Sequence, residues 1–257
     1  MRASFPERPE AGPALARVLL DQVAAGERPP TVRVSRPGRV VAFGRRDTVS
    51  PGYPAAVAAM RATGFRGMER LTGGRVAAHA EGTMVLTLTT PEPAPAEGTG
   101  ARFRFGAELV RVALADLGVD ARLGPVPGEY CPGEWSINGA GRIKLAGIGQ
   151  RMVKGAAHVG FVIVATGSAT IRSVLVPVHE ALGLEWDPAT AGAAEDLRPG
   201  VSLDDVEAAL LARLAAGSTL AEVELDRATR ELAEAGADRY RPPRPGDRVA
   251  PWPRTKN

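Results

Sequence analysis

The 257-residue sequence contains a single cysteine, few aromatic residues (5%) and no long apolar run. One cysteine excludes an internal disulfide, and no segment approaches the roughly 18 consecutive apolar residues of a membrane span. Charges and prolines interrupt the N-terminal stretch MRASFPERPEAGPALARV, where a signal peptide needs an unbroken apolar segment. We therefore expect a cytoplasmic protein with no membrane partner, and its 44% hydrophobic content is sufficient for a packed core.

Lysine is also scarce, because arginine supplies nearly all of the positive charge. Of the 32 basic residues, only Lys144, Lys154 and Lys256 are lysines. Arginine stays protonated, whereas the compact lysine amine is readily tuned by burial, so a retained lysine indicates a site that needs this group. We expect Lys144 to serve such a site and Lys154 to occupy a solvated hairpin position.

The positive charge is too small and too scattered to indicate nucleic-acid binding. The net charge is only +3, and no platform of interleaved aromatic and basic residues is present. Residues 202–236 hold eight acidic residues against three arginines, and residues 239–257 hold six basic residues against one aspartate. Five prolines in this last stretch predict a basic, poorly ordered tail at residues 238–257.

Hydrophobic periodicity predicts a mixture of helices and strands. Apolar residues recur at helical spacing in residues 13–25, 53–64, 103–118 and, interrupted by Pro177, 170–183. Two further helices are predicted within residues 202–236, joined around Gly217, with Ser202 and Thr219 as N-caps. Strands are predicted at residues 31–35, 39–44, 83–90, 142–153 and 158–166, with residues 154–157 joining the last two. Short β-type runs broken by glycines fill residues 64–82.

This order of elements favours an α/β fold of the mixed α+β kind. The strands do not alternate strictly with helices, and several are close enough in sequence to pair as hairpins. We expect a central mixed β-sheet with packed helices in residues 1–200 and a small helical C-terminal section in residues 201–237.

Cys131 lies in the loop sequence EYCPGEWSI, residues 129–137. A lone intracellular cysteine is most often a buried small hydrophobic residue. Its acidic, proline and glycine neighbours suit a core poorly, which favours a reactive thiol on a loop. A free thiol is largely protonated at neutral pH and needs a nearby base or positive charge. Lys144 is the candidate, because a hairpin would return its strand alongside the loop.

A second candidate is the glycine-rich segment RLTGGRVAAHAEG, residues 70–82. Paired glycines allow the backbone to approach a ligand closely, and Arg70, Arg75 and His79 supply hydrogen-bond donors around them. A glycine-rich hairpin with solvated arginines explains the segment equally well. It lacks the ending of a phosphate-binding loop and the context of a dinucleotide fold.

Together the two segments resemble the lipoate and biotin protein ligase superfamily. RLTGGRVAAH is similar to the glycine-rich signature of that superfamily, and FGRRDT, residues 43–48, to its upstream glycine-arginine stretch. YCPGEWSINGAGRIKLAGIGQRM resembles the cysteine loop and lysine strand of the acyl-transferring branch. The resemblance spans roughly residues 40–165 with the segments in the same order.

The resemblance implies a fold like that of class II aminoacyl-tRNA synthetases and biotin synthetases, with residues 1–200 as the acyltransferase catalytic domain. It implies that a cysteine thioester carries an octanoyl or lipoyl group to a lysine of a lipoyl domain. The donor would be a lipoyl-domain or glycine-cleavage carrier protein, and no cofactor or metal would be required. Apolar side chains such as those of Val76, Val85, Leu86 and Ile148 would line a tunnel for the chain.

Residue by residue, the resemblance makes Cys131 the nucleophile and Lys144 the group that activates the thiol or orients the acyl carbonyl. Backbone amides between Lys144 and Gly147 are candidates for holding the oxyanion. The substrate-binding residues implied are Arg70, Thr72, Gly73, Gly74, Arg75, His79 and Gly147.

Two alternatives remain open at this stage. An ATP-dependent lipoate-protein ligase would need magnesium and form an acyl-adenylate, with Cys131 incidental; Ala80 stands where many such ligases have aspartate, which disfavours it. A non-catalytic binder of lipoyl or biotinyl domains is disfavoured by the presence of both Cys131 and Lys144. Asp47 and the pair Trp135-Ser136 also depart from the pattern and leave the subgroup and the acyl donor open.

Overall fold

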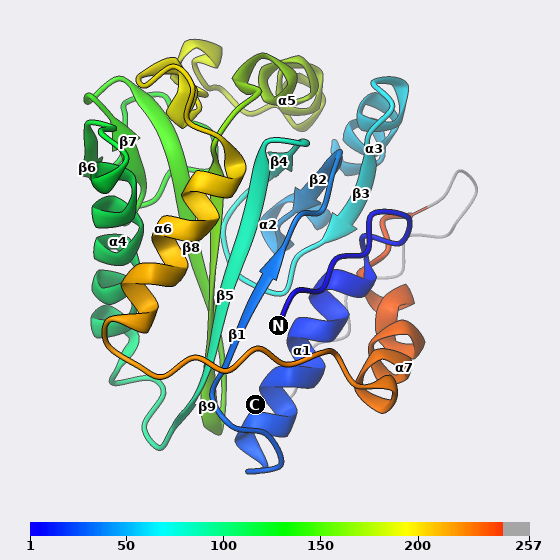
Figure 1. The fold of residues 1–257 in the computed structure, drawn as a ribbon. Helices are drawn as coiled ribbons and strands as arrows, with labels where there is room; N and C mark the ends of the chain where they lie inside the picture. Colours follow the sequence, from blue (N-terminus) through cyan, green and yellow to red (C-terminus); the bar gives the residue numbers. More distant parts are fainter. Residues whose placement is uncertain (244–257) are drawn as a thin grey trace.

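The computed structural model describes residues 1–243, and it contains two β-sheets with helices packed around them (Figure 1). The larger sheet has six antiparallel strands in the order β1 (Thr31–Ser35), β5 (Thr83–Glu92), β9 (Gly155–Val164), β8 (Ile143–Val153), β7 (Ile137–Gly139) and β6 (Ala121–Leu123). The smaller sheet has three strands in the order β3 (Arg66–Glu69), β2 (Val40–Phe43) and β4 (Ala77–His79).

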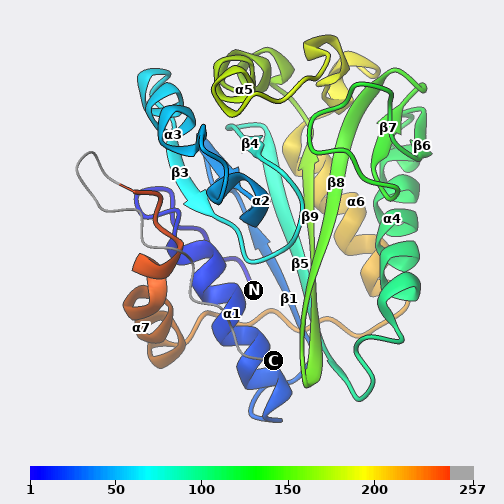
Figure 2. The same cartoon turned by 180° about the vertical axis from the view of Figure 1, so that it is seen from behind.

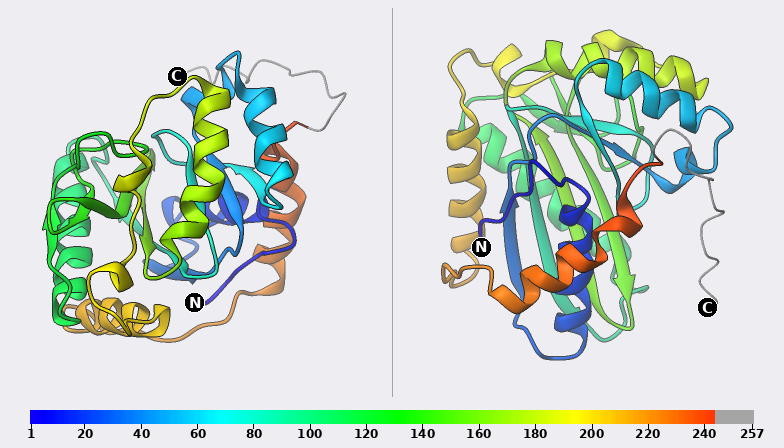
Figure 3. Two further views of the ribbon diagram at one scale, coloured as in Figure 1. Left: turned by 90° about the horizontal axis from the view of Figure 1, so that it is seen from above. Right: turned by 90° about the vertical axis from the view of Figure 1, so that its right-hand side faces the viewer.

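The helices lie on both sides of the large sheet and above the small one. The α-helices are α1 (Ala11–Ala24), α2 (Arg45–Thr48), α3 (Tyr53–Ala62), α4 (Thr99–Asp116), α5 (Ser168–Leu182), α6 (Leu203–Ala215) and α7 (Arg227–Gly236). Short 3-10 turns are η1 (Pro188–Thr190), η2 (Ala194–Asp196) and η3 (Ala237–Tyr240). Figure 3 shows α3 beside α5, and α7 along α1.

The mixed α/β class is confirmed, but the pairing differs from a single mixed sheet. Every strand pair in the large sheet is antiparallel, and the parallel pair, β2 with β3, belongs to the small sheet. The parallel pair follows from α3, which connects β2 to β3 and packs on the small sheet, because parallel neighbours need a crossover.

The two faces of the large sheet have different compositions. Side chains alternate along a strand, so Met84, Leu86, Phe161 and Ile163 point to one face and pack with α4 and α6 in the largest hydrophobic core. The opposite face carries glycine, threonine, histidine, Val85, Val162 and one arginine, and faces α1 and the small sheet. This second face provides the wall of a cavity described below.

Three local predictions were wrong. The second C-terminal helix begins at Arg227 with Asp226 as its N-cap, not at Thr219, because residues 216–226 cross the molecule from α6 to α7 (Figure 1). Only Lys154 separates β8 from β9, so the predicted four-residue connection is largely strand, although Lys154 itself is exposed as expected.

Pro177 does not interrupt α5, which is one helix over Ser168–Leu182. Proline in a helix interior costs about 3 kcal/mol. Burial of Ile171, Val174, Leu175 and Val178 against α3 and the small sheet offsets this cost.

The predicted cap at Ser202 is confirmed, because its hydroxyl accepts a hydrogen bond from the Asp205 backbone N–H. Of the predicted tail, residues 244–257 lie outside the described residues, while η3 buries Tyr240 against α1. No helix within residues 1–243 is long and apolar enough to cross a membrane.

Candidate functional site

A cavity of about 500 Å³ lies between this second face of the large sheet, the small sheet and α1. Its size falls within the range typical of small-molecule pockets, about 300–1,000 Å³. Figure 2 shows the segment that joins β3 to β4 crossing the large sheet, and residues 70–74 of this segment form part of the cavity wall. The cavity is lined by these predicted site residues: Cys131, Lys144, Arg70, Thr72, Gly73, Gly74, His79 and Gly147.

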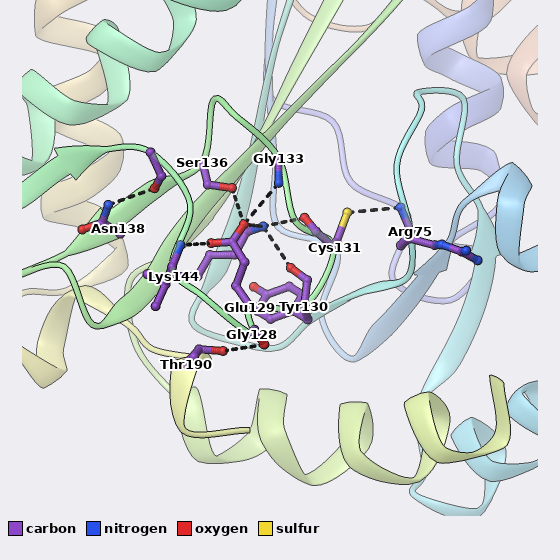
Figure 4. Close-up of polar contacts among 12 residues, drawn as sticks. Arg75, Gly128, Glu129, Tyr130, Cys131, Gly133, Ser136, Asn138, Lys144 and Thr190 are labelled. Carbon is purple, nitrogen blue, oxygen red and sulfur yellow. Dashed lines mark hydrogen bonds and ion pairs between the residues drawn. The ribbon is translucent and has the colours of Figure 1, made fainter. Parts of the chain in front are cut away.

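The cysteine loop, which connects β6 to β7, places the thiol of Cys131 against the glycine-rich segment (Figure 4). Arg70 Nη2 and the backbone N–H of Arg75 each donate a hydrogen bond of 3.2 Å to Cys131 Sγ. The side chain is half-buried and lines the cavity. In the folded protein, the cysteine of this loop is therefore a thiol that accepts two hydrogen bonds and faces the cavity.

The surroundings of the thiol favour its ionised form. Burial raises the pKa of Cys131, but the charges of Arg70 and Lys144 and the hydrogen bonds from Arg70 and the Arg75 backbone outweigh it. The net pKa lies below the ordinary thiol value. Because the thiolate is the nucleophilic form, the site favours a reactive cysteine over an inert one.

Lys144 lies at the start of β8 and is almost fully buried, with 3% of its side chain exposed. Its ammonium donates to Glu129 Oε1 at 2.9 Å, to the Tyr130 carbonyl at 3.0 Å and to the Cys131 carbonyl at 2.7 Å (Figure 4). It also lies 5.0 Å from the centre of the Tyr130 ring. The amine thus binds the backbone on which the thiol is mounted, and its charge acts on the sulfur from there.

Glu129 is the site residue that sequence reasoning missed. Its side chain is fully buried, contrary to the expectation that it suits an exposed loop. Besides Lys144, its carboxylate accepts from the backbone N–H groups of Val126 and Gly133 and from the Ser136 hydroxyl at 2.6 Å. One carboxylate therefore ties together both ends of the cysteine loop.

This network explains the backbone conformation of Cys131. Its φ of 44° lies in the left-handed region, which non-glycine residues seldom adopt. Such a conformation costs on the order of 1–3 kcal/mol and persists only where surrounding contacts fix it. The Lys144 ammonium bound to the Cys131 carbonyl, and the Glu129 contacts on either side, supply that restraint.

The glycine-rich segment contributes one arginine side chain, that of Arg70, and one backbone N–H, that of Arg75, to the thiol. Gly74 has a φ of 104°, and a Cβ there would collide with Arg70 and lie 3.0 Å from Cys131 Sγ. Arg75 contributes its backbone, with the N–H bound to the thiol and the carbonyl accepting from Arg70 Nη2, because its guanidinium turns away to Asp47, 3.2 Å distant, and does not line the cavity. The two glycines therefore have different surroundings, since a Cβ at Gly73 would meet no atom within 4 Å.

His79 lines the cavity from β4, with both ring nitrogens buried and without hydrogen-bond partners among residues 1–243. Burial, with a smaller effect of the Arg70 charge, lowers its pKa to about 4, so the ring is neutral at physiological pH.

The predicted tunnel residues divide into two groups. Val85 and Ile148 line the cavity, whereas Val76 and Leu86 are fully buried in the two main hydrophobic cores. Val85 and Leu86 are neighbours on β5, so only one of them can face the cavity. Within residues 1–243 no cluster of three or more histidine, cysteine or acidic side chains is suited to hold a metal ion.

Comparison with known proteins gives a consistent result. The chain matches the lipoyl protein ligase A/B catalytic domain over residues 9–214. An octanoyl-[GcvH]:protein N-octanoyltransferase of Geobacillus kaustophilus is 29% identical over 188 residues, 73% of this chain and 66% of that protein. A lipoyl-[GcvH]:protein N-lipoyltransferase of Listeria monocytogenes is 30% identical over 159 residues, 62% of this chain and 56% of that protein. The chain spans less than two thirds of the length of these relatives.

Solved structures share the fold. A lipoate-protein ligase A bound with ATP superimposes with a TM-score of 0.75 at 20% identity, covering 93% of both chains. The bipartite lipoate protein ligase of Thermoplasma acidophilum superimposes with a TM-score of 0.70 at 20% identity, covering 92% of this chain and 90% of that one.

Proposed function

Because this chain belongs to the lipoyl protein ligase A/B catalytic domain family, we propose that it is a cysteine-dependent acyltransferase for octanoyl or lipoyl groups. The acyl group would pass through a thioester on Cys131 to a lysine of a lipoyl-domain protein. The observation that carries the proposal is a half-buried thiol on the wall of the cavity, with two donors at 3.2 Å and a lowered pKa.

The transfer takes place in two steps, with protons exchanged with solvent. The Cys131 thiolate adds to the carbonyl of an acyl-lysine amide on the donor, a C–S bond forms, and the C–N bond breaks as the amine leaves with one proton. A lysine amine of the acceptor then attacks the thioester, a new C–N bond forms, and the thiolate leaves while one proton is released. No nucleotide is consumed, because the energy of one amide is conserved in the other.

Each group at the site has a defined part in this scheme. Arg70 and the Arg75 N–H stabilise the thiolate before attack and after release. Lys144 and Glu129 hold the loop that presents the sulfur. The cavity binds the acyl chain, since the burial of each methylene group contributes about 0.8 kcal/mol to binding.

The names of the relatives favour a glycine-cleavage carrier as the donor and other lipoyl domains as acceptors. We propose the same partners here, in the cytoplasm. We also propose that residues 1–200 form the catalytic unit, with residues 201–237 as an appended helical section.

Intact-mass spectrometry tests the proposal. After exposure to an octanoylated carrier domain, the wild-type protein should gain the mass of one octanoyl group, and Cys131→Ala should gain none. Both should then be assayed for transfer to a second lipoyl domain without ATP, where we expect at least a 10³-fold loss for the variant.

Two results would contradict the proposal. Full, ATP-dependent activity in Cys131→Ala would favour a lipoate-protein ligase that forms an acyl-adenylate with magnesium. Binding of the carrier with neither an adduct nor transfer in the wild type would favour a non-catalytic binder.

A further inference from the structure

One long strand of the large sheet, β8, has a free edge beside the cavity. On one side β8 pairs with β9 from Ala146 to Val153, whereas on the other side β7 pairs with it only as far as Ala146. Figure 2 shows β8 running past the ends of the short strands β6 and β7. No other strand among residues 1–243 continues along this side, so residues 147–153 form an unpaired edge roughly 20 Å long.

The backbone groups of alternate residues point out of this edge. Just beyond β9, the Ala165 N–H donates to the Gly82 carbonyl on the β5 side. Because these directions alternate along a strand, Gly160 directs its N–H and C=O toward β8, and its register partner Gly149 directs its own toward β9. The neighbours of Gly149 therefore point outward, and the structure gives their backbone groups no partner within residues 1–243. The outward-facing residues are Ile148, Gln150 and Met152.

This edge is exposed and lacks the features that usually protect one. Every residue from 147 to 153 is partly exposed. Natural proteins commonly block free edges with prolines, lysines or bulges, but this stretch has no proline or lysine, and its register with β9 runs without a shift. At the opposite side of the sheet, residues 1–3 cover β1, where the Ala3 N–H donates to the Val34 carbonyl at 3.0 Å. This difference favours a partner strand at the β8 edge.

The free edge begins next to the cysteine loop. Gly147, its first residue, lies beside Lys144, because a Cβ there would be 3.6 Å from Lys144 Cε. The Lys144 ammonium in turn donates to the Cys131 carbonyl at 2.7 Å. Ile148 and Gln150 belong to the edge and also line the cavity. A strand added along β8 would therefore pass the part of the cavity that holds the thiol.

Contacts from α4 hold this edge in place without covering its backbone. Arg102 on α4 donates from Nε to Gln150 Oε1 at 3.0 Å and from Nη2 to Met152 Sδ at 3.1 Å. Both contacts are made by side chains on the face of the sheet that α4 covers. The edge is thus ordered before any partner arrives, which lowers the entropic cost of binding.

We propose that the β8 edge binds the carrier domain by strand addition, with an extended segment of the carrier lying beside residues 147–153. The inference rests on the proposed function and states how its protein partner docks. The proposed transfer requires one thiol to receive two different carriers in turn, the donor and the acceptor. Main-chain hydrogen bonds suit this requirement, because every extended segment offers them whatever its side chains. The acylated lysine would lie next to the added strand and reach into the cavity.

Amide hydrogen exchange, measured residue by residue by NMR, tests the inference without any acyl transfer. In the free protein, the outward amides of Ile148, Gln150 and Met152 should exchange fast. The amides of Gly149 and Arg151, which face β9, should exchange slowly. Addition of an unmodified glycine-cleavage carrier domain should slow exchange of the outward group about 10-fold or more and leave the inward group unchanged. This alternating pattern is specific to an added strand.

A proline variant tests the edge in the transfer reaction. Met152→Pro removes an outward N–H and keeps the pairing with β9, because proline is tolerated where its position faces away from the ladder. We expect the KM for the octanoylated carrier to rise about 10-fold, since a main-chain hydrogen bond is lost and the ring crowds the added strand. Acylation of Cys131 by the octanoyl thioester of N-acetylcysteamine, which needs no carrier, should stay within about twofold of the wild type and shows that the variant is folded.

Leu123→Pro on the other edge strand, β6, is the matched control. The Gly124 N–H donates to the Ser136 carbonyl on the β7 side, so the N–H of Leu123 points away from β7. A proline at this second free edge should leave the KM for the carrier within about twofold of the wild type.

The outcomes separate this inference from the proposed function. Protection of the outward amides by the carrier supports it even if Cys131 forms no acyl adduct and the proposed function fails. Three results would overturn it: no protection of these amides on addition of the carrier, equal effects of the two prolines, or their protection in the protein alone by a second copy of the chain, seen as a dimer in light scattering.

Discussion

At the scale of single residues, Lys144 explains why a lysine persists in this arginine-rich chain. Its three ammonium protons are all donated, to one carboxylate and two loop carbonyls. A compact ammonium reaches three acceptors that converge from different directions, whereas the planar guanidinium of arginine spreads its donors in one plane. The amine therefore stabilises the cysteine loop and lowers the pKa of the thiol through its charge.

Removing the charge of Glu129 should destabilise the whole protein. Glu129→Gln keeps the shape of the side chain but leaves Lys144 buried without a counter-ion, which costs about 3–5 kcal/mol. Urea denaturation followed by circular dichroism measures this as a decrease in the free energy of unfolding.

Two matched variants test whether the expected loss of stability comes from the burial of the Glu129–Lys144 ion pair. Asp116→Asn breaks the exposed pair with Arg213 and should cost less than about 1 kcal/mol. The double variant Glu129→Gln/Lys144→Met should recover part of the loss, since it removes the unpaired charge. If Glu129→Gln costs no more than Asp116→Asn, the proposed role of the buried pair is wrong.

At the scale of elements, long amphipathic segments were predictable and short connections were not. The helices α1, α3 and α4 and the strands β5, β8 and β9 contain enough residues for their period to show. The strands β6 and β7 have three residues each, too few to show a period, and they form by pairing with each other and with β8. The start of α7 was missed because Arg28, far away in sequence, binds the capping residue Asp226 at 2.5 Å.

The same distinction applies to the candidate site. Motifs pointed to Cys131 and Lys144, whereas the burial of Glu129 depends on Lys144, fifteen residues later, and no local pattern shows it. Arg33, which lines the cavity from β1, stands between Val32 and Val34, a pattern typical of a strand with one solvated face. The sequence pattern that could have indicated a polar, ligand-facing sheet surface at Arg33 is TMVLTLTT. In it, threonines alternate with large apolar residues on a strand that pairs with β1.

The segment between β3 and β4 should tolerate a methyl group at one glycine but not at the other. Gly74→Ala forces a positive φ on alanine and displaces Arg70 from the thiol. We expect a loss of about 1 kcal/mol or more in unfolding free energy, and roughly 10-fold slower alkylation of Cys131 by iodoacetamide at pH 7.

Gly73→Ala is the matched control, because a Cβ there meets no atom within 4 Å. It should leave thiol reactivity within about twofold of the wild type. Equal effects of the two substitutions would show that Gly74 does not position Arg70.

At the scale of the whole molecule, ion pairs join the N-terminal segment and the residue after β1 to α6. Arg2 and Arg36 both contact the nearly buried Glu207 of α6, at 2.9 Å and 2.7 Å. At the other end of the crossing segment, α7 packs along α1, with Leu15, Leu19 and Ala233 in one small core. Because α1 also lines the cavity, a buried titratable group in the cavity wall should affect global unfolding.

Two such groups are His79 and His158, which burial keeps neutral with pKa values of about 4, against 6.5 for an unperturbed histidine. The nearby charges of Arg70 and Arg33 lower these values further. Between pH 6.5 and 4 the unfolded chain binds protons that the folded protein does not, so stability falls as the pH falls through this window. Each histidine contributes about 3 kcal/mol above pH 6.5, and this is lost toward pH 4.

The pH dependence of unfolding therefore tests the electrostatics of the cavity directly. Between pH 7 and pH 5, where few carboxylates titrate, we expect the free energy of unfolding to fall by about 2 kcal/mol for each histidine. His79→Gln and His158→Gln should each remove about 2 kcal/mol of this decrease, whatever their stability at pH 7, and the double variant should keep the part due to His179, whose pKa burial also lowers. Urea titrations at the two pH values measure these differences. A double variant with the same decrease as the wild type would mean that neither ring is held neutral in the folded protein.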